Sequence, residues 1–473
     1  MPKNIKKKIE LLCPAGDLER LKTAVVFGAD AIYCGLPEWS LRNPREITFN
    51  LETLKEGIQF AHKHGVKVYL TFNIFPHEKQ IKEIKFFFAK ASKDLREIDG
   101  VIVSDLGMLV LVKKYLPKVP IHISTQANTL NSEAVLQWAK LGAERVVLAR
   151  ELTLEEIKEI KKKMGQIWGE HKGQTSGYSR RSDLCSSVKL EVFGHGAMCV
   201  AYSGRCLLSK YFTGRESNLG DCAQSCRWKY KVKSCRDNSR VVPTGKYFLQ
   251  EETRPDDLLE IQEDEKGTYI LNSKELCALD ILDQFIEAGI DSLKIEGRAK
   301  TVYYLATVTR VYRKAIDKYY ELSSKPQRGP FGAVSKKEYE NTIKELYKEL
   351  NLIQNRGYSH GFLLSSEGYE QEYSNAAFKP PVTFIGIVIK LKVESKKLGA
   401  HLECYLVEVK NKFKVGEKIE IVTPDKIYKT KILEIVDEKG NFLNEILTPQ
   451  EKVWVKFDLK EKIPERSILR RRK

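Results

Sequence analysis

Four cysteines in one short stretch are the residues of this sequence best suited to chemistry. Cys199, Cys206, Cys222 and Cys226 lie within 28 residues, and six, fifteen and three residues separate the successive pairs. Such thiolates suit soft metals, either zinc in a tetrahedral site or an iron–sulfur cluster. No Cys-x-x-Cys knuckle of a zinc ribbon is present, so the spacing favours a loop wrapped around a multi-iron cluster. Thiols without metal are the other alternative, and Cys277 competes for one ligand position.

Three further side chains are candidate acids or bases. His195 lies four residues before the first cysteine, between two glycines that let a ligand approach closely. It is either a catalytic residue or substrate ligand, or a histidine satisfied within the fold. Glu296 and Tyr202 complete the candidate catalytic group. Tyr202, together with Trp228, could instead shield a metal cluster from water or stack on a nucleobase.

Four polar residues are candidates for binding a substrate. Arg150 and Arg298 suit a carboxylate, because a guanidinium donates two parallel hydrogen bonds to its oxygens. Gln126 and Asp105 are polar residues that closely follow apolar runs. A structural ion pair between Glu296 and Arg298 is the alternative interpretation of that pair.

Most of these residues follow short apolar runs that are typical of β-strands. Strands are expected at residues 9–13, 31–34, 66–72, 101–103, 121–124, 146–148, 190–193 and 292–295. Amphipathic stretches predict helices at 17–27, 51–64, 79–92, 106–115, 132–141, 154–163, 273–288 and 301–321. Asp17 and Ser132 are the expected N-caps, and Gly28, Gly65 and Gly142 the expected helix stops.

Eight strands that alternate with helices predict an α/β protein with a parallel sheet closed into a (β/α)8, TIM-like barrel. An open α/β sheet is the alternative, because about a hundred residues separate the seventh strand from the eighth. Functional residues of such barrels lie at the carboxyl ends of the strands, which is where the candidates in strand-following positions fall.

The sequence predicts three regions. Residues 1–322 form the barrel and carry the cysteine loop at 191–230, with a Gly/Ser-rich insertion at 165–187 that we expect to loop out. Residues 323–379 form a helical linker region with a helix at 336–350. Alternating apolar runs and short turns at 380–473 predict a small C-terminal antiparallel β-barrel.

The charge of the chain suits a polyanionic partner. The formal net charge is +17, and residues 381–473 hold 21 Lys and Arg against 14 Asp and Glu. The C-terminal region is therefore a candidate RNA-binding domain, with Arg470–Lys473 expected to contact RNA, although a lysine-rich solvated face gives the same count. No run approaches the roughly 18 apolar residues of a membrane span. Ten cysteines without a signal peptide predict a reducing, cytoplasmic location and no membrane partner.

The motif EVFGHGAMCVAYSGRCLLS at residues 191–209 resembles the signature of the collagenase-like peptidase family, peptidase family U32. The resemblance extends to ELLCPAGDLERLKTAVVFGADAIYCGL, ILNSKELCALDILDQFIEAGIDSLKIEGRAK and NRGYSHGF, and covers most of the chain. Its length and C-terminal barrel are similar to the tRNA-hydroxylating branch, whereas the 165–187 insertion departs from the family pattern.

The resemblance implies an oxygen-independent hydroxylation of the wobble uridine of tRNA to 5-hydroxyuridine. It further implies a 4Fe–4S cluster, with Cys199, Cys206, Cys222 and Cys226 matching the family's cysteine motif, and prephenate as the source of the hydroxyl. The expected partners are tRNA and an electron donor or iron–sulfur assembly proteins.

Two other functions remain open from the sequence. A collagenase-like peptidase would need a nucleophile and a base; the sequence has no HExxH or GxSxG motif, but Cys199 near His195 fits a cysteine nucleophile by spacing. A cluster-containing RNA-binding protein without catalysis is the third interpretation.

Overall fold

The structure, a computed structural model, describes residues 8–40, 48–170, 188–199, 201–219, 221–227, 247–251, 254–264, 267–269, 273–324, 333–365, 380–392 and 404–473. The chain forms two compact units. The first comprises Met1–Asp17, Ala31–Ala299 and Asn355–Phe378, and the second comprises Leu18–Asp30, Lys300–Gln354 and Lys379–Lys473.

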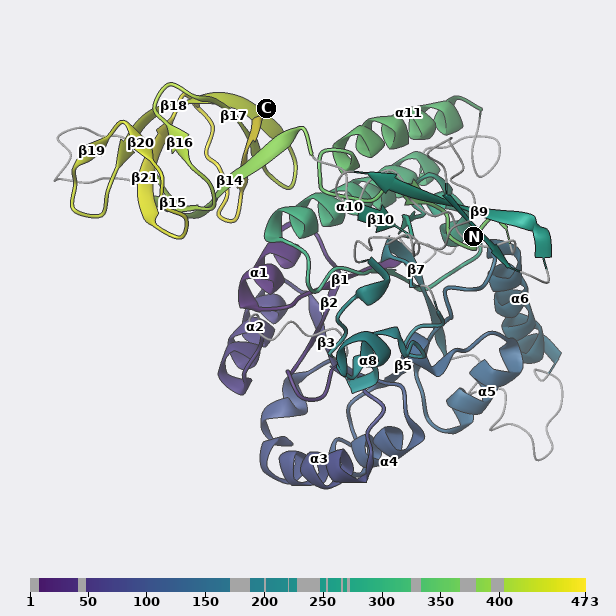
Figure 1. Cartoon of the computed structure of the whole chain (residues 1–473). Helices are drawn as coiled ribbons and strands as arrows, with labels where there is room; N and C mark the ends of the chain where they lie inside the picture. Colours follow the sequence, from purple (N-terminus) through teal and green to yellow (C-terminus); the bar gives the residue numbers. More distant parts are fainter. Residues whose placement is uncertain are drawn as a thin grey trace, which may run out of the picture. The chain divides into compact units, whose positions relative to one another are not determined.

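The first unit is built on eight parallel strands that close into a barrel (Figure 1). Closure is complete because β12 pairs with β1 on one side and with β7 on the other. The strands are β1 (Glu10–Pro14), β2 (Ala31–Gly35), β3 (Lys67–Phe72), β4 (Gly100–Val103), β5 (Ile121–Ile123), β6 (Arg145–Val147), β7 (Lys189–Ala197) and β12 (Ser292–Ile295). The predicted TIM-like barrel is confirmed, and the open-sheet alternative is wrong.

Helices follow the strands at nearly the expected positions. They are α1 (Leu18–Val26), α2 (Leu51–Lys63), α3 (Glu78–Ala91), α4 (Leu106–Tyr115), α5 (Ser132–Lys140), α6 (Leu154–Glu170), α8 (Leu208–Thr213), α9 (Leu282–Glu287), α10 (Val302–Ser324) and α11 (Ala333–Leu350). Gly28, Gly65 and Gly142 have φ values of 100°, 72° and 87°, as the predicted stops require. The N-cap of α5 is Asn131, whose side chain accepts from the Ala134 amide, and not the expected Ser132.

The helix expected over 273–288 is wrong in its first half. Glu275–Cys277 instead forms β11, which pairs antiparallel with the last residues of β7, and a 3-10 turn at Leu279–Ile281 precedes α9. The long β7 extends beyond the end of its neighbour β6, and pairing with the last residues of β7 outweighs the helical periodicity of this segment. Strand β13 (Tyr358–Ser359), from the NRGYSHGF motif, pairs parallel with β11.

A small antiparallel sheet lies between β7 and β11 in the sequence. It contains β8 (Tyr247–Glu251), β9 (Arg254–Asp264) and β10 (Gly267–Tyr269), in the order β10-β9-β8. The sequence also predicts extended segments at 228–233 and 241–249. Residues 228–233, which include Trp228, and residues 241–246 lie outside the described residues, as do residues 171–187 of the insertion.

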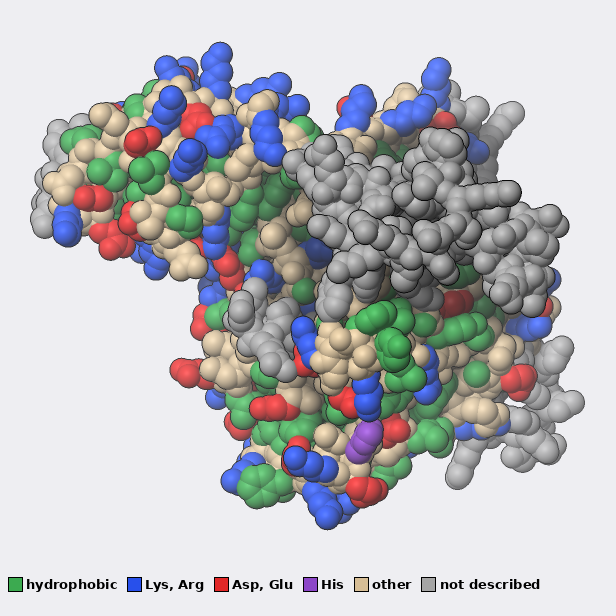
Figure 2. All heavy atoms as spheres, in the orientation of Figure 1, with side chains coloured by type: hydrophobic (Ala, Val, Ile, Leu, Met, Phe, Trp, Pro, Cys, Tyr) green, Lys and Arg blue, Asp and Glu red, His purple; other side chains and the backbone are tan. Residues whose placement is uncertain are grey.

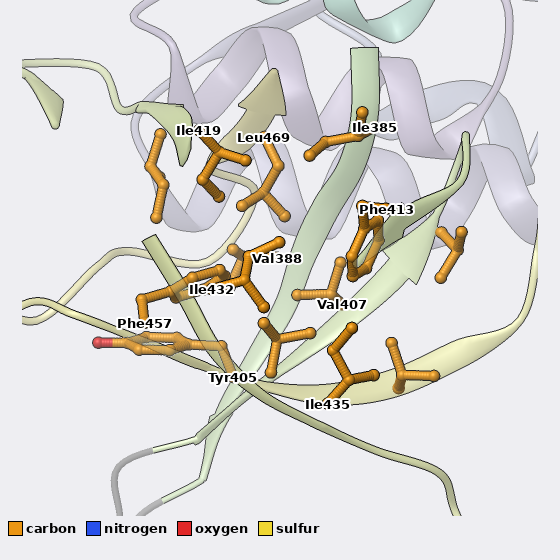
Figure 3. Close-up of a cluster of buried hydrophobic side chains, with 14 of the residues drawn as sticks. Ile385, Val388, Tyr405, Val407, Phe413, Ile419, Ile432, Ile435, Phe457 and Leu469 are labelled. Carbon is orange, nitrogen blue, oxygen red and sulfur yellow. The ribbon is translucent and has the colours of Figure 1, made fainter. Parts of the chain in front are cut away.

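The C-terminal part of the second unit is a six-stranded antiparallel barrel, as predicted. Its order is β17-β22-β14-β15-β21-β18, closed by pairing of β17 with β18. Aliphatic and aromatic side chains such as Ile385, Val407, Ile435 and Phe457 fill it, as Figure 3 shows. The strands are β14 (Val382–Lys392), β15 (Cys404–Val409), β16 (Phe413–Lys414), β17 (Lys418–Val422), β18 (Ile427–Val436), β19 (Phe442–Leu443), β20 (Glu445–Ile446), β21 (Lys452–Phe457) and β22 (Ile468–Arg472).

The three arginines at the C-terminus are part of strand β22 of this barrel. Arg470 is 1% exposed, with its Nε bonded to Glu420 at 2.8 Å and its Nη1 donating to the Tyr303 hydroxyl of α10 at 3.1 Å. Arg471 pairs with Glu417, and Arg472 bonds Glu420. The expectation that Arg470 contacts RNA is therefore wrong, because its guanidinium is buried and bonded to Glu420 and Tyr303.

Among the helices of the described residues, none is long and apolar enough to cross a membrane.

Candidate functional site at the carboxyl ends of the barrel strands

Arg150 and Glu296 form a buried ion pair at this end of the barrel. The Nη1 atom of Arg150 lies 2.6 Å from Glu296 Oε2, and the two side chains are only 5% and 13% exposed. Arg150 also donates to the carbonyl of Ala197, and its guanidinium lies 3.8 Å above the ring of Phe193. The structure thus gives Glu296 the partner Arg150 where the sequence suggested Arg298. A substrate carboxylate at Arg150 would have to share it with Glu296.

Arg298 lies in a small polar cluster of its own. Its Nη1 atom donates to Ser40 Oγ at 2.6 Å and to Thr71 Oγ1 at 3.1 Å, and the two hydroxyls contact each other. Thr71 in turn donates to the carbonyl of Cys34 at 2.9 Å. Burial raises the pKa of the Cys34 thiol to about 12 even though Arg298 opposes the shift, so Cys34 stays protonated. The cluster joins one cation and two hydroxyls, which is a suitable set for a carboxylate or phosphate.

A glycine keeps this cluster compact. A Cβ atom on Gly35, the last residue of β2, would lie 2.3 Å from Ser40 Oγ and 2.4 Å from Thr71 Oγ1. Neither Ser40 nor Thr71 carried a signal in the sequence, since each is a common residue in an apolar or loop context.

His195 is fully buried near the end of β7. In the strand register it faces Cys277 of β11 and Ile295 of β12, and its carbonyl accepts from the Glu296 amide at 2.8 Å. Its ring centroid is 5.4 Å from that of Tyr358, a residue of the NRGYSHGF motif. The structure therefore brings His195, Glu296 and Cys277 to adjacent strand ends and adds Tyr358, which the sequence did not single out.

Gly196 permits the close contact between β7 and β12. Its φ is 129°, and a Cβ atom there would lie 2.5 Å from the Cβ of Glu296. Any larger residue would be strained and would push Glu296 away from Arg150.

Gln126 lies in a hydrogen-bonded amide and hydroxyl cluster. Its Oε1 atom accepts from Asn73 Nδ2 at 3.1 Å, from Ser104 Oγ at 3.2 Å and from Ser124 Oγ. Asp105 instead caps α4 by accepting from the Met108 amide at 3.0 Å. Its geometry is that of a helix cap, so Asp105 has a structural role whether or not it also contacts a substrate.

The cysteine-bearing segment packs on the loops that follow β3 and β5. The Phe75 amide donates to the Asn218 carbonyl at 3.2 Å, and the guanidinium of Arg205 lies 4.8 Å from the Phe75 ring. Gly204 has a φ of 77°, and a Cβ atom there would lie 2.8 Å from Gln126 Cγ. Figure 1 shows α8 of this segment in front of the barrel strands. Tyr202 is 45% exposed on it.

The four cysteines of this segment are thiols outside any disulfide and are half-buried, whereas Cys277 on β11 is fully buried. The Cys222 sulfur accepts from the Gln224 amide at 3.4 Å, and the Cys206 carbonyl accepts from Ser217 Oγ at 2.7 Å. Within the described ranges, which include all five cysteines, no three His, Cys, Asp or Glu side chains are placed to hold a single metal ion.

Four separate thiols still fit a four-iron cluster by number and chemistry. Each iron of such a cluster takes one thiolate, whereas a single zinc ion needs several donors at one point. Reduced, half-buried sulfurs at the end of a barrel offer this donor set.

The fold and this end of the barrel define a class of protein: a (β/α)8 barrel whose seventh strand carries a four-cysteine segment. The family model of "Peptidase family U32" matches residues 16–373, and that of "Peptidase family U32 C-terminal domain" matches residues 382–470. The chain belongs to peptidase family U32.

Proteins with different names are similar to this chain. The chain is 36% identical to "tRNA hydroxylation protein P" of Escherichia coli over 446 residues, covering 88% of this chain and 86% of that one. It is 35% identical to "tRNA hydroxylation protein P1" of Bacillus subtilis, covering 99% and 96%. It is also 28% identical to a "Collagenase" of Porphyromonas gingivalis, covering 80% of each chain.

Proposed function

We propose that this protein is an RNA-modifying enzyme that hydroxylates the wobble uridine of tRNA to 5-hydroxyuridine without molecular oxygen. The observation that carries the proposal is the segment of four reduced, half-buried thiols packed on the carboxyl end of the barrel. Similarity over nearly the whole chain to proteins named for tRNA hydroxylation supports the choice of substrate. We place the activity in the cytoplasm.

Cys199, Cys206, Cys222 and Cys226 would hold a 4Fe–4S cluster, with Cys277 as the alternative for one position. When bound, such a cluster supplies single-electron transfer. An electron donor and iron–sulfur assembly proteins are the corresponding partners.

The reaction constrains the second substrate. Replacing the C5 hydrogen of uridine by a hydroxyl removes two electrons from the base. Transfer of the hydroxyl from an R–OH donor balances when the donor takes up those two electrons and the C5 proton and becomes R–H. Prephenate, the proposed donor, carries two carboxylates. Arg298, with the hydroxyls of Ser40 and Thr71, offers one binding point for them. Arg150 is the second candidate, oriented by Glu296 and by the ring of Phe193.

Proton transfer falls to the side chains at the ends of β7 and β12. His195 and Glu296 are the proposed acid and base, because loss of the C5 proton requires an acceptor near the base. Tyr202 lies on the cysteine segment and is exposed enough to stack on the uridine. Gln126 is held in place by three donors and leaves its amide NH₂ for the substrate.

Mass spectrometry of tRNA nucleosides tests the proposal. A strain that lacks this protein and its paralogues should lose 5-hydroxyuridine and its derivatives, and the wild-type gene should restore them. A Cys222→Ser gene should not. An unchanged nucleoside profile in the deletion strain would refute the function.

The peptidase alternative makes a different prediction. A protease would need one reactive thiol and no cluster, whereas a cluster enzyme needs its cysteine ligands together. Cleavage of gelatin by the purified metal-free protein, abolished by Cys199→Ala alone, would favour the peptidase.

A further inference from the structure

The β17–β18 hairpin of the C-terminal barrel has an unusual charge arrangement. Lys418 and Lys431 are direct partners in the antiparallel ladder, and both side chains are exposed. Like charges directly opposite each other destabilise a sheet. Lys429 lies two residues before Lys431, so strand alternation places it on the same outer face.

Glu420, the ladder partner of Lys429, does not neutralise this face. Its carboxylate accepts from Arg470 Nε at 2.8 Å and from Arg472 Nε at 2.7 Å, so two cations already share it. Burial by itself raises the pKa of Glu420, but the bonds and charges of Arg472 and Arg470 outweigh it, and the net shift is downward.

Three other lysines of the same barrel lie beside acidic residues. Lys452 is the ladder partner of Glu408, and Lys456 pairs with Glu434 at 3.2 Å. Lys410 pairs with Glu408 as well. Among the ion pairs of the described residues, by contrast, none includes Lys418, Lys429 or Lys431. What distinguishes the hairpin is that two lysines lie directly opposite each other in the ladder with no ion pair to either in the described part of the chain.

The positive face continues beyond the hairpin turn. Lys426 is exposed in that turn, and Lys314 of α10 reaches the carbonyl of Asp425 at 2.7 Å. The acidic neighbours include Asp425 and Asp458, the latter bonded through its backbone to Lys431 and Thr430. Glu417, next to Lys418 in the chain, pairs with Arg471. Figure 2 shows Lys and Arg side chains gathered over the β17 and β18 region of the barrel.

We propose that this hairpin face, centred on Lys418, Lys429 and Lys431, binds the phosphate backbone of the RNA substrate. Isolated ammonium groups act as point charges that suit phosphates of any sequence, whereas recognition of a base edge needs directed donors and acceptors. The inference rests on the proposed function for the identity of the RNA. The barrel would hold the body of the RNA by charge, leaving recognition of the uridine to the other unit.

The test compares two triple variants of the full-length protein in binding to bulk tRNA at several salt concentrations. K418Q/K429Q/K431Q removes the unpaired lysines. K439Q/K452Q/K456Q removes the same charge from the same barrel, at a turn, opposite Glu408 in the ladder and at the Lys456–Glu434 pair. We expect the first variant to bind at least about tenfold more weakly and to lower the slope of log K against log salt by about 2 to 3. The second should remain close to wild type, and K418R/K429R/K431R should retain binding.

Equal weakening of tRNA binding in both triple variants would overturn the proposed binding surface. It would show that only the total positive charge of the barrel matters. Wild-type binding and slope in the first variant would also overturn the proposed surface. If the deletion strain loses 5-hydroxyuridine in that case, the proposed function stands while the surface falls. If the wild-type protein binds no tRNA and the nucleosides are unchanged, both fall.

Discussion

At the scale of single residues, the Arg150–Glu296 pair combines two candidates that the sequence assigned to separate roles. One was a substrate-binding cation and the other a catalytic carboxylate. Because the two buried side chains contact each other, the proposed role of each depends on its partner. Glu296 orients the guanidinium, and the guanidinium in turn lies beside the carboxylate that is proposed to take part in proton transfer.

Replacing Glu296 by Gln should lower the free energy of unfolding. The substitution leaves Arg150 buried without its carboxylate, and loss of one partner of a buried pair costs about 3 kcal/mol of unfolding free energy. Urea denaturation measures this, and 5-hydroxyuridine formation should fall in parallel. Glu159→Gln, which removes the exposed partner of Lys163, should leave the stability close to that of the wild type. Equal stability of the two variants would show that the buried pair contributes little.

The five candidate cysteines differ in whether we expect the protein to need them to retain the cluster. Cys199, Cys206 and Cys222 should each be required, so that replacement by Ala removes iron and labile sulfide from the purified protein. Cys226 and Cys277 compete for the last position, and only one of them should be required. Cys404, buried in the C-terminal barrel, is the control and should retain full iron content. Full iron in the Cys222→Ala protein would contradict the cluster assignment.

At the scale of elements, four barrel strands are linked by charges that cross the barrel interior. Arg145 of β6 bonds Glu10 of β1 at 2.5 Å and Glu191 of β7 at 2.8 Å, and Lys294 of β12 bonds Glu191 at 2.9 Å. Tyr69 of β3 donates to Glu10 at 2.9 Å. Burial of such charges is acceptable only because every carboxylate has a cation beside it.

This network predicts sensitivity to acid. Burial by itself raises the pKa of Glu10, but the hydrogen bond and charge of Arg145 outweigh it and hold that pKa below its ordinary 4.5. A carboxyl with a lowered folded-state pKa stabilises the protein above its unfolded pKa. The stabilisation is lost as the pH falls through the folded-state value. Stability should therefore decline steeply below about pH 4.5.

Thermal unfolding of wild type and Glu10→Gln across this pH range tests the assignment. The variant should be less stable near neutrality and should depend less on pH in the acid range. Parallel curves would assign the acid sensitivity to other carboxylates.

The elements were predictable where local patterns decide them. All eight barrel strands follow from short apolar runs, and glycines mark the helix ends because only they adopt the left-handed conformation cheaply. Residues 275–277 were not predictable, since their strand exists only through pairing with a β7 that extends past its neighbour. Local periodicity contains no information about such a partner.

The residues of the candidate site also fall into two groups, those that the local sequence points to and those that only long-range contacts reveal. The cysteines, His195 and Glu296 were recognisable because rare or reactive residue types stand out at strand ends. Ser40, Thr71 and Tyr358 were not, because their roles depend on contacts between segments far apart in the chain. The sequence also could not show that Arg470 is buried, since a run of basic residues at a chain end is normally solvated.

At the scale of the whole molecule, the second unit shows that the C-terminal barrel is not a simple appendage. Arg310 of α10 is 4% exposed, donates through Nε to the Thr423 carbonyl of the barrel at 2.8 Å and pairs with Glu349 of α11. One cation thus joins two helices and the barrel. Helix α1 belongs to the same unit, where Glu19 lies 3.5 Å from Lys410.

Replacing Glu349 by Gln should therefore loosen the barrel as well as α11. The substitution leaves the buried Arg310 without its carboxylate, at a cost of roughly 3 kcal/mol, and the Thr423 carbonyl alone cannot compensate the charge. Hydrogen exchange should become faster in α11 and in β17, which leads into Thr423, while β3 of the other unit keeps its protection. Glu345→Gln, which removes the exposed partner of Lys348 on the same helix, is the matched control. Faster exchange confined to α11 would mean that the barrel is held without Arg310, and the second unit would then be two independent parts.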